Sequence, residues 1–551
     1  MKNKIKKINQ SNRKIVFNIL AIICIILFCT AISPVTMQND TYYTVKIGES
    51  ILENGIDGKD HFSWHEDLNY EYPHWLYDVI MYSIYYIGGW TGIYISTIIF
   101  ACILGIILYI TNVKVCKNHI VPFIITIGAM ALIRSYVAAR AQLVTFILFV
   151  LEILFIEKFM KNRKFGYALG LFVICILIAN LHVAVWPFFF VLFLPYIAEY
   201  LICVILDLSL PSKIMKLIYK IQKRIFVKNQ DKVKILEEKI EKEEEKAIIT
   251  KKKREENRKN PYKIVVEKNK NVKYLILIML ISVLLGLCTP LGQTPYTYLI
   301  DTMQGDTTQN INEHLPLTLI NQKDILGLLI VIIAILMLTK VKIKLRDLFM
   351  LGGLIILALM SRRQISMLVL IGSTIIGKIV LAFFRKYNCM NDLKVLFKGM
   401  TGFYGFGITL CIIIIISTNI YRPKIDDTYV DESTYPVKAC DYILEELDVS
   451  NIRIYNEYNY GSYMLFRGIP VFIDSRADLY TPEFNPGCNV FDDFLNISNI
   501  GTYYENKFDE YDITHVICYK NAKLNMFLSR NYEYKELYSD DRFVIYERDK
   551  V

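Results

Sequence analysis

Residues 15–40 read IVFNILAIICIILFCTAISPVTMQND, a long apolar run that ends in a carboxylate. An α-helix needs about 20 apolar residues to cross the roughly 30 Å hydrocarbon core of a bilayer. The run lacks a small-x-small cleavage site, so it is predicted to be a retained helix and not a signal peptide. The preceding segment Met1–Lys14 carries six Lys/Arg and no acid, which predicts a cytoplasmic amino terminus. Asp40 is then expected just beyond the outer end of the first span.

The rest of the chain repeats this pattern. At 54% hydrophobic residues and a mean hydropathy of +0.34, the 551 residues are too apolar for a soluble protein of this size. We therefore expect an α-helical polytopic membrane protein with about eleven transmembrane helices. The expected spans are Ile15–Met37, Gly89–Tyr109, Ile120–Ile133, Leu143–Ile156, Phe165–Ala179, Val183–Leu206, Tyr274–Cys288, Ile325–Leu338, Leu348–Met360, Ile365–Phe384 and Gly402–Ile420, with residues 74–87 forming a short helix that leads into the second.

The charges of the connections predict the orientation and the domains. Alternate connections are rich in lysine, and these are expected on the cytoplasmic side. After the last span, residues 421–551 carry 14 basic and 24 acidic residues, which favours an extracytoplasmic location. The predicted parts are a basic cytoplasmic tail (1–14), the first part of the membrane core (15–206, with an outer loop at 38–74), a charged cytoplasmic insert (207–273), the second part of the core (274–420) and an extracytoplasmic α/β domain (421–551).

The insert has charge on every face. Its residues 213–273 contain 21 Lys/Arg against 10 Asp/Glu. This composition predicts a solvated helical hairpin against anionic headgroups, with a docking site for a cytosolic partner as the alternative. Acidic and basic blocks alternate and the densest run has no aromatic residue, so a nucleic-acid partner is not expected. The twelve cysteines include no CxxC pair, so neither a disulfide framework nor a zinc knuckle is implied.

Residues 421–551 show a mixture of helical and strand patterns. YPVKACDYILEEL (435–447) has helical spacing, whereas NIRIYNEY (451–458), IPVFIDSRADLY (469–480) and THVICY (514–519) predict strands. Residues 534–549 predict a hairpin that turns at 539–541. Gly461, within residues 458–463, indicates a turn or bulge near the membrane surface.

The polar residues capable of chemistry gather at the outer ends of the predicted spans. A random distribution of polar residues would not fall on one side of the membrane, whereas an external active site would. Asp40 is the candidate catalytic base, because a carboxylate near the headgroups can have its basicity raised; ordinary helix capping is the equal alternative. The candidate substrate-binding residues are His74, Arg134, Arg140, Asn180, His182, Glu313, His314, Arg362, Arg363, Asp474 and Arg476.

Several of these residues lie in motifs that resemble those of the GT-C membrane glycosyltransferases, which include protein O-mannosyltransferases and lipid A aminoarabinose transferases. The stretch from Asp40 through GESILENG to YEYPHWLYDVIMYSIYYIGG resembles their first outer loop. Further motifs resemble an uncharacterised bacterial branch: RSYVAARAQLVTF, ANLHVAV, CTPLGQTPY, INEHLP, SRRQI and YNEYNYGSYMLFRGIPVFIDSRADLY. The resemblance implies that Asp40 is the catalytic base or a metal-linked residue. The acid pair of the family is ND here and its PPL segment is YPHW, which leaves the metal and the donor open.

Physical chemistry gives these residues roles. Arginine suits phosphate oxygens, so the four outer arginines (Arg134, Arg140, Arg362 and Arg363) are candidates for the phosphate of a lipid-linked sugar, with headgroup snorkelling as the alternative. His182 beside Asn180 is a candidate for phosphate or a hydroxyl, or else a satisfied interface residue. Glu313 and His314 assist Asp40 or hold a metal, although two adjacent ligands form a poor set. Asp474 and Arg476 either close over the sugar or form an internal salt bridge.

The sequence thus predicts a cell-membrane glycosyltransferase of the inverting type. It would transfer a sugar from a polyprenyl-phosphate donor to a polysaccharide, lipid or protein acceptor of the cell envelope, at the outer face of the membrane. A transporter or flippase of an envelope precursor and a non-catalytic scaffold of the same fold are the alternatives. The cofactor is unknown: a divalent metal is compatible with the residues but not required by them.

Overall fold

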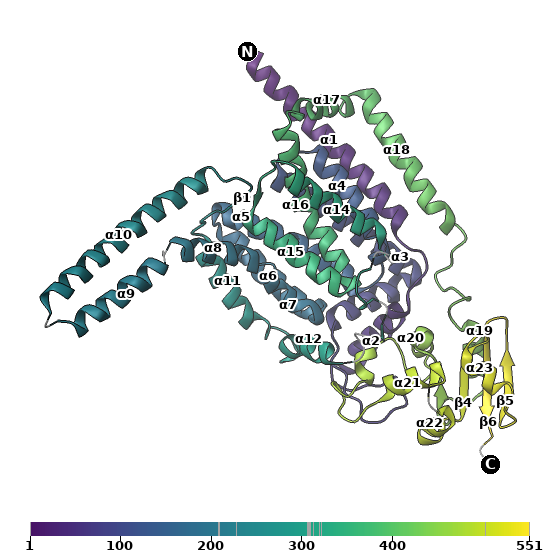
Figure 1. Ribbon diagram of the computed structural model, residues 1–551. Helices are drawn as coiled ribbons and strands as arrows, with labels where there is room; N and C mark the ends of the chain where they lie inside the picture. Colours follow the sequence, from purple (N-terminus) through teal and green to yellow (C-terminus); the bar gives the residue numbers. More distant parts are fainter. Residues whose placement is uncertain are drawn as a thin grey trace.

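The computed structural model describes residues 2–207, 210–227, 229–305, 310–311, 313–318, 320, 322–501 and 503–549. Most of them are helical, as Figure 1 shows. The amino terminus lies at one end of the molecule and the carboxyl terminus at the other (Figure 1).

The core of the protein is built from long apolar helices. Among the described residues, five helical segments are long and apolar enough to cross a membrane: Ser11–Ile32, Trp75–Cys116, Val183–Asp207, Arg362–Lys386 and Phe403–Lys424. Ile120–Leu132, Phe165–Leu181 and Val272–Leu285 are shorter apolar helices. The predicted class, a helical membrane protein, is therefore confirmed, while the number of crossings stays a prediction. The core helices are α1 (Lys2–Ile32), α3 (Trp75–Cys116), α4 (Ile120–Leu132), α5 (Ala141–Asn162), α6 (Phe165–Leu181), α7 (Trp186–Val191), α8 (Leu194–Asp207), α11 (Val272–Leu285), α12 (Thr294–Gln304), α14 (Lys323–Leu338), α15 (Leu345–Met360), α16 (Ile365–Lys386), α17 (Met390–Met400) and α18 (Phe403–Tyr421), with 3-10 turns η1 (Arg134–Tyr136), η2 (Val183–Val185), η3 (Arg362–Gln364) and η4 (Arg422–Lys424).

Each predicted span overlaps one or more of these helices, although α1 ends at Ile32 and not at Met37, and α11 ends at Leu285 and not at Cys288. Two spans differ further. The second helix begins at Trp75 and continues to Cys116 through a kink at Gly89, whose φ of 57° is in the left-handed region. The span predicted at Val183–Leu206 is broken into η2, α7 and α8. In the packed core, α1 lies along α18 and α3, α3 contacts α5, and α16 contacts α15, α4 and α3.

The insert forms the predicted helical hairpin. Helices α9 (Leu210–Ile225) and α10 (Gln230–Lys259) pack against each other and project away from the core (Figure 1). Ion pairs join them, among them Lys216 with Glu244 and Lys223 with Glu237. Where the chain returns, β1 (Ile264–Val265) pairs in parallel with β2 (Ile343–Lys344).

The C-terminal segment, residues 421–549, contains a four-stranded sheet of order β3-β4-β6-β5. The strands are β3 (Ile454–Tyr455), β4 (His515–Tyr519), β5 (Tyr534–Ser539) and β6 (Phe543–Arg548); the helices are α19 (Val437–Glu446), α20 (Tyr458–Phe466), α21 (Val490–Asn499), α22 (Tyr504–Glu510) and α23 (Lys523–Leu528), with the 3-10 turn η5 (Ala477–Tyr480). The predicted helix at 435–447, the strand at 514–519 and the hairpin at 534–549 are confirmed.

Two local predictions in this segment are wrong. Residues 458–463 form the start of helix α20 and not a turn. Gly461 is needed for close approach: a Cβ there would lie 2.0 Å from the carbonyl oxygen of Ile473. Residues 469–480 are not a strand of the sheet. Val471 instead forms an isolated bridge with Ser63 of the first outer loop, so its backbone partners come from a distant part of the chain.

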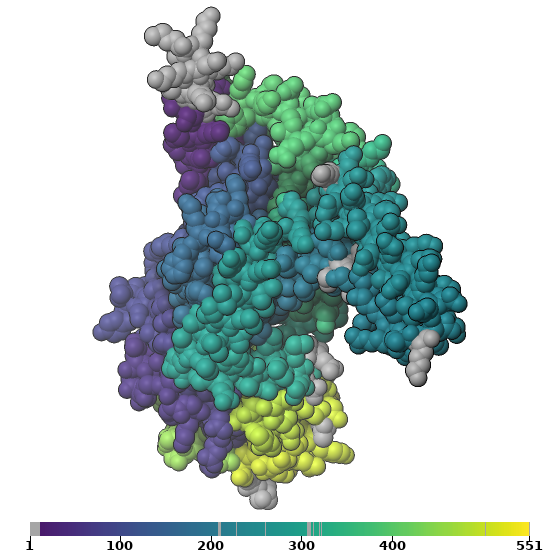
Figure 2. Space-filling model, turned by 90° about the vertical axis from the view of Figure 1, so that its left-hand side faces the viewer, coloured from purple at the N-terminus to yellow at the C-terminus, as the bar shows by residue number. Residues whose placement is uncertain are grey.

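The first outer loop and the C-terminal segment are joined by many polar contacts. The Trp64 indole donates to the Ile454 carbonyl (3.0 Å), and the backbone amide of Asn69 donates to the Asn485 side chain (2.7 Å). The loop contains helix α2 (Asn39–Asn54), which packs on α3 and on α20. In Figure 2 the yellow C-terminal segment lies against this end of the purple and teal core. The contacts hold the segment over the ends of the core helices, where most of the candidate residues lie.

Candidate functional site

A cavity of about 510 Å³ opens between the core and the C-terminal segment. Three helix N-termini border it: Asp40 lies in the first turn of α2, and His74 and Arg140 are the N-caps of α3 and α5. Helix N-termini carry partial positive charge and exposed N–H groups. These helix ends therefore favour an anionic group placed beside them. Eight of the twelve candidate residues line the cavity: Asp40, His74, Arg140, His182, Glu313, His314, Arg363 and Arg476.

Arg140 connects two carboxylates at the centre of this wall. Its Nε lies 3.1 Å from Asp40 Oδ2, and its guanidinium donates to Glu313 Oε1 at 3.0 Å. Asp40 lies inside α2, and the helix N-cap is Gln38, so the carboxylate is directed to an ion pair rather than to capping. Burial alone would lower the pKa of Arg140, but Asp40 and Glu313 more than offset it and raise that pKa. Asp40, Arg140 and Glu313 therefore form one carboxylate–guanidinium–carboxylate cluster.

The loop that carries Glu313 is held by the turn at Arg362–Gln364. The backbone amide of Arg363 donates to the Glu313 carbonyl (3.0 Å), and that of Arg362 donates to Leu315 (2.9 Å). Burial raises the pKa of Glu313, but the charges of Arg140 and Arg363 lower it below the usual value. The pKa of His314 is lowered to about 4 by burial and by Arg363, so this imidazole is neutral near pH 7.

The guanidinium of Arg363 lines the cavity and has no carboxylate within salt-bridge distance among the described residues. It nevertheless acts on its surroundings, since its charge lowers the pKa of Glu313, His314 and His182. A cation that faces a cavity without a carboxylate partner is a suitable contact for a phosphate oxygen.

His74 belongs to a hydrogen-bonded chain. Its Nδ1 lies 2.6 Å from Asp78 Oδ1, and its Nε2 lies 3.1 Å from the Tyr43 hydroxyl. Burial lowers the pKa of His74, but the charge and hydrogen bond of Asp78 raise it above its ordinary value. The spacing of His74 and Asp78, four residues apart at a helix start, could have identified this pair from the sequence. His182 lies nearby, with ring centroids 6.4 Å apart.

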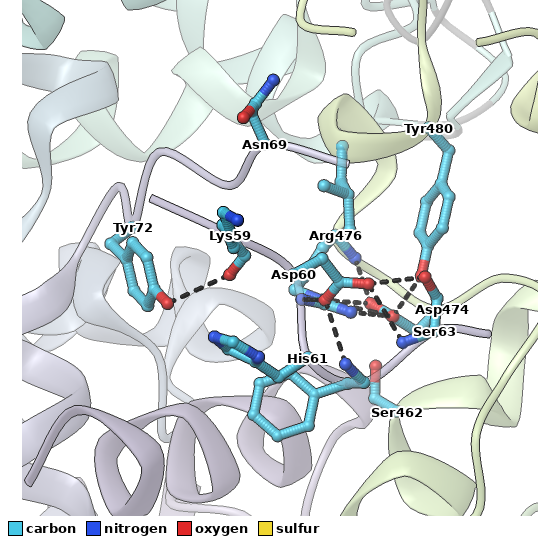
Figure 3. Close-up of polar contacts among 12 residues, drawn as sticks. Lys59, Asp60, His61, Ser63, Asn69, Tyr72, Ser462, Asp474, Arg476 and Tyr480 are labelled. Carbon is cyan, nitrogen blue, oxygen red and sulfur yellow. Dashed lines mark hydrogen bonds and ion pairs between the residues drawn. The ribbon is translucent and has the colours of Figure 1, made fainter. Parts of the chain in front are cut away.

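Asp474 and Arg476 form a buried ion-pair network whose third member was missed (Figure 3). Arg476 donates to Asp474 at 2.7 and 2.9 Å and to Asp60 of the first outer loop at 2.6 Å. The Tyr480 hydroxyl donates to Asp474 at 2.6 Å. The side chains of both aspartates are 0% exposed and that of Arg476 is 2% exposed. The expected salt bridge within the C-terminal segment is therefore present, and Arg476 extends it to Asp60, which fastens the segment to the loop beside the cavity.

The remaining candidates lie outside the cavity lining. Asn180 uses its amide to accept from the Trp75 indole (3.2 Å) and to donate to the carbonyls of Ile176 and Cys288. Arg134 is exposed on η1, and Arg362 contributes backbone contacts. No direct signal in the sequence identified these other lining residues: Asn39, Tyr43, Tyr70, Glu71, Tyr298, Tyr458, Asp478 and Phe484.

The described residues contain no group of three or more His, Cys, Asp or Glu side chains that could hold a metal ion. Asp40 and Glu313, the two carboxylates joined in this wall, already share the guanidinium of Arg140. Among the described residues, these two carboxylates therefore do not make up a metal-binding set.

No protein-family model matches the chain, and no curated protein matches it. A search of solved structures finds the archaeal oligosaccharyltransferase AglB from Archaeoglobus fulgidus, in complex with an inhibitory peptide and a dolichol-phosphate. The TM-score is 0.55 at 10% identity, and the match covers 98% of this chain and 74% of the other. This likeness shows that the two chains share a fold, which agrees with the fold that the sequence resemblance implies. The narrower likeness to O-mannosyltransferases and aminoarabinose transferases is not shown by it.

Proposed function

We propose that this protein is a membrane glycosyltransferase that uses a polyprenyl-phosphate sugar as donor and a cell-envelope molecule as acceptor. The observation that carries the proposal is the joint placement of Asp40, Arg140, Glu313 and Arg363 in one cavity at the end of the core helices. The structural neighbour contains a dolichol-phosphate and a peptide, which is consistent with a lipid-linked donor and a separate acceptor.

The orientation follows from charge. The basic segment before the first span and the basic insert are assigned to the cytoplasm by the positive-inside rule. The cavity lies beside the C-terminal segment, at the opposite end of the molecule from the amino terminus (Figure 1). The transfer site is thus assigned to the outer leaflet.

The donor phosphate is assigned to Arg363 and His74. Arg363 offers a planar set of N–H donors, and Asp78 favours the protonated form of His74. The N-termini of α2, α3 and α5 add partial positive charge on the same side. As the sugar–phosphate bond breaks, negative charge grows on the leaving phosphate, and these groups stabilise it.

The sugar is assigned to the part of the cavity nearer the C-terminal segment. Tyr70, Tyr298 and Tyr458 line the cavity, and their aromatic side chains are assigned to contacts with the sugar. Glu71 and Asp478 are carboxylates that can accept hydrogen bonds from sugar hydroxyls. Asp478 already accepts from the Tyr298 hydroxyl at 2.8 Å, which fixes the position of both side chains.

The reaction is a single displacement at the anomeric carbon. The acceptor hydroxyl oxygen forms a bond to that carbon and the bond from the carbon to the phosphate oxygen breaks. The electron pair leaves with the polyprenyl phosphate, and Asp40 takes the hydroxyl proton. Arg140 orients the Asp40 carboxylate through the 3.1 Å ion pair. One displacement inverts the configuration of the sugar.

The test uses the full chain reconstituted in vesicles with radiolabelled polyprenyl-phosphate hexoses and an envelope fraction as acceptor. Asp40→Asn should lower transfer by about a hundred-fold or more, the usual contribution of a positioned base. The matched control is Asp67→Asn, an exposed aspartate of the same loop outside the cavity. If Asp40→Asn transfers sugar as fast as Asp67→Asn, the assignment is wrong. Translocation of the donor without transfer would identify a flippase instead.

A further inference from the structure

A second cavity, of about 540 Å³, lies at the opposite end of the same helices. Its lining comes from the C-terminal ends of α3, α5 and α16 and from the start of α15, next to the β1–β2 pair. On α5, Arg140 belongs to the first cavity and Glu157 to the second, so a helical rise of 1.5 Å per residue separates the two by about 26 Å. The second cavity is a separate place for a ligand.

The lining of this cavity is strongly basic, with nine cationic and three acidic side chains. The three acidic side chains form ion pairs with lysines of the same lining: Lys378 contacts Glu157 at 2.9 Å and Asp347 at 2.8 Å, and Lys344 contacts Glu267 at 2.8 Å. Six lining cations have no carboxylate within salt-bridge distance in the part of the chain that the structure describes, namely Lys114, Lys117, Lys158, Lys161, Lys342 and Arg385. The cavity therefore carries a large uncompensated positive charge.

Arg346 is a buried cation of this lining with an incomplete set of hydrogen bonds. It is only 7% exposed and lines the cavity, yet its Nε donates no hydrogen bond among the described residues. Its carboxylate neighbours lie at 3.4 Å (Glu267), 3.7 Å (Glu199) and 4.0 Å (Glu157). A buried guanidinium N–H without an acceptor is costly, and a phosphate oxygen is the acceptor that suits it best.

The positive-inside rule explains why lysines are abundant at this end, but it does not explain a hollow that concentrates them around a buried arginine. Basic pockets between transmembrane helices on the cytoplasmic side bind anionic lipid headgroups. We propose that this cavity binds the phosphate headgroup of an anionic lipid in the leaflet opposite the transfer site. The site does not depend on the transfer reaction, since the residues of the two cavities are different.

The experiment measures lipid binding to the purified full chain in neutral detergent by native mass spectrometry. The probes are phosphatidylglycerol, polyprenyl phosphate, zwitterionic phosphatidylcholine and inorganic phosphate. The test variant is Lys158→Gln with Lys342→Gln, which removes two unpaired cations of the lining. The matched control is Lys164→Gln with Lys273→Gln, two exposed lysines outside it.

Phosphatidylglycerol or polyprenyl phosphate should bind the wild type, and whichever anionic lipid binds more tightly identifies the source of the phosphate. Each lysine near a membrane surface strengthens the binding of an anionic lipid, so the loss of two should weaken binding about thirty-fold. The control variant should bind like the wild type. Binding should also weaken in molar salt, which tests the idea without any substitution. Equal binding by both variants, equally tight phosphatidylcholine, or binding of inorganic phosphate alone would overturn the proposal.

Discussion

The sharpest prediction for stability concerns Arg476, which we would replace by leucine. Leucine retains part of the apolar bulk of the arginine stem but leaves the carboxylates of Asp60 and Asp474 buried without their cation. Removing one partner of a buried ion pair costs about 3–5 kcal/mol, because the remaining charge stays desolvated. All three side chains are at most 2% exposed, so solvent screening does not reduce this figure.

The effect should be local to the joint between the first outer loop and the C-terminal segment. Hydrogen exchange of the backbone amides of residues 62–64 and 471–476 reports the opening of this joint. A cost of 3–5 kcal/mol corresponds to exchange that is faster by between about a hundred-fold and a few thousand-fold. Arg530→Leu, at an exposed arginine of the same segment, is the control and should leave exchange unchanged.

The stability of this joint should change with pH in a defined direction. Burial raises the pKa of Asp60, but Arg476 and the Ser63 hydrogen bonds lower it below the usual value. The wild-type joint is therefore most stable above the ordinary aspartate pKa and loses stability as the pH falls through the depressed folded pKa. In the leucine variant the charge of Arg476 no longer opposes burial and the pKa of Asp60 rises, so acidification relieves the penalty and the stabilities of the two proteins converge.

A second substitution makes the reasoning refutable. Asp60→Asn in the Arg476→Leu background removes one of the stranded charges and should restore part of the protection. Exchange in Arg476→Leu that matches the Arg530→Leu control, or a deficit that grows as the pH falls, would show that the buried network is not what joins the two parts.

Three further outcomes follow from the site and its surroundings. Arg363→Leu should lower transfer by about 10²–10³-fold through loss of phosphate stabilisation, while Arg134→Leu, outside the cavity, should match the wild type in the same assay. Binding of polyprenyl phosphate should weaken as the pH rises through the elevated pKa of His74; Asp78→Asn should move this loss to lower pH, and an unmoved profile would remove His74 from the phosphate site. Gly461→Ala places a Cβ 2.0 Å from a carbonyl oxygen and should cost more than about 1–3 kcal/mol, read as a lower thermal midpoint.

The helical class could be predicted because apolar length is a local property of the sequence. Every expected span overlaps at least one helix, since about 15–20 apolar residues in lipid have to satisfy their backbone groups internally. The broken helix at residues 183–207 was missed because its break lies within a continuous apolar run. Residues 469–480 were predicted as a strand because they begin with the apolar, partly β-branched run IPVFI, yet Val471 pairs with the first outer loop and not with the sheet.

Several residues of the candidate site could be predicted from the sequence, but the contacts between them could not. The clustering of polar residues at the outer ends of the spans placed Asp40, Arg140 and Glu313 on one side of the membrane. Arg140 and Glu313, which are in contact, lie 173 positions apart in the sequence. Arg476 and Asp60 lie 416 positions apart. No periodicity encodes such contacts. The His74–Asp78 pair is the exception, since its four-residue spacing on a helix is readable.

The most direct measurement of the central claim is the glycan composition of the cell envelope. It compares cells that produce the wild-type protein, the Asp40→Asn variant, the Asp67→Asn variant or none. If the cavity around Asp40 and Arg140 transfers sugar, one glycan component is missing both without the protein and with Asp40→Asn, and it is present with Asp67→Asn. Identical glycans in all four strains, with the protein produced at equal levels, would contradict it.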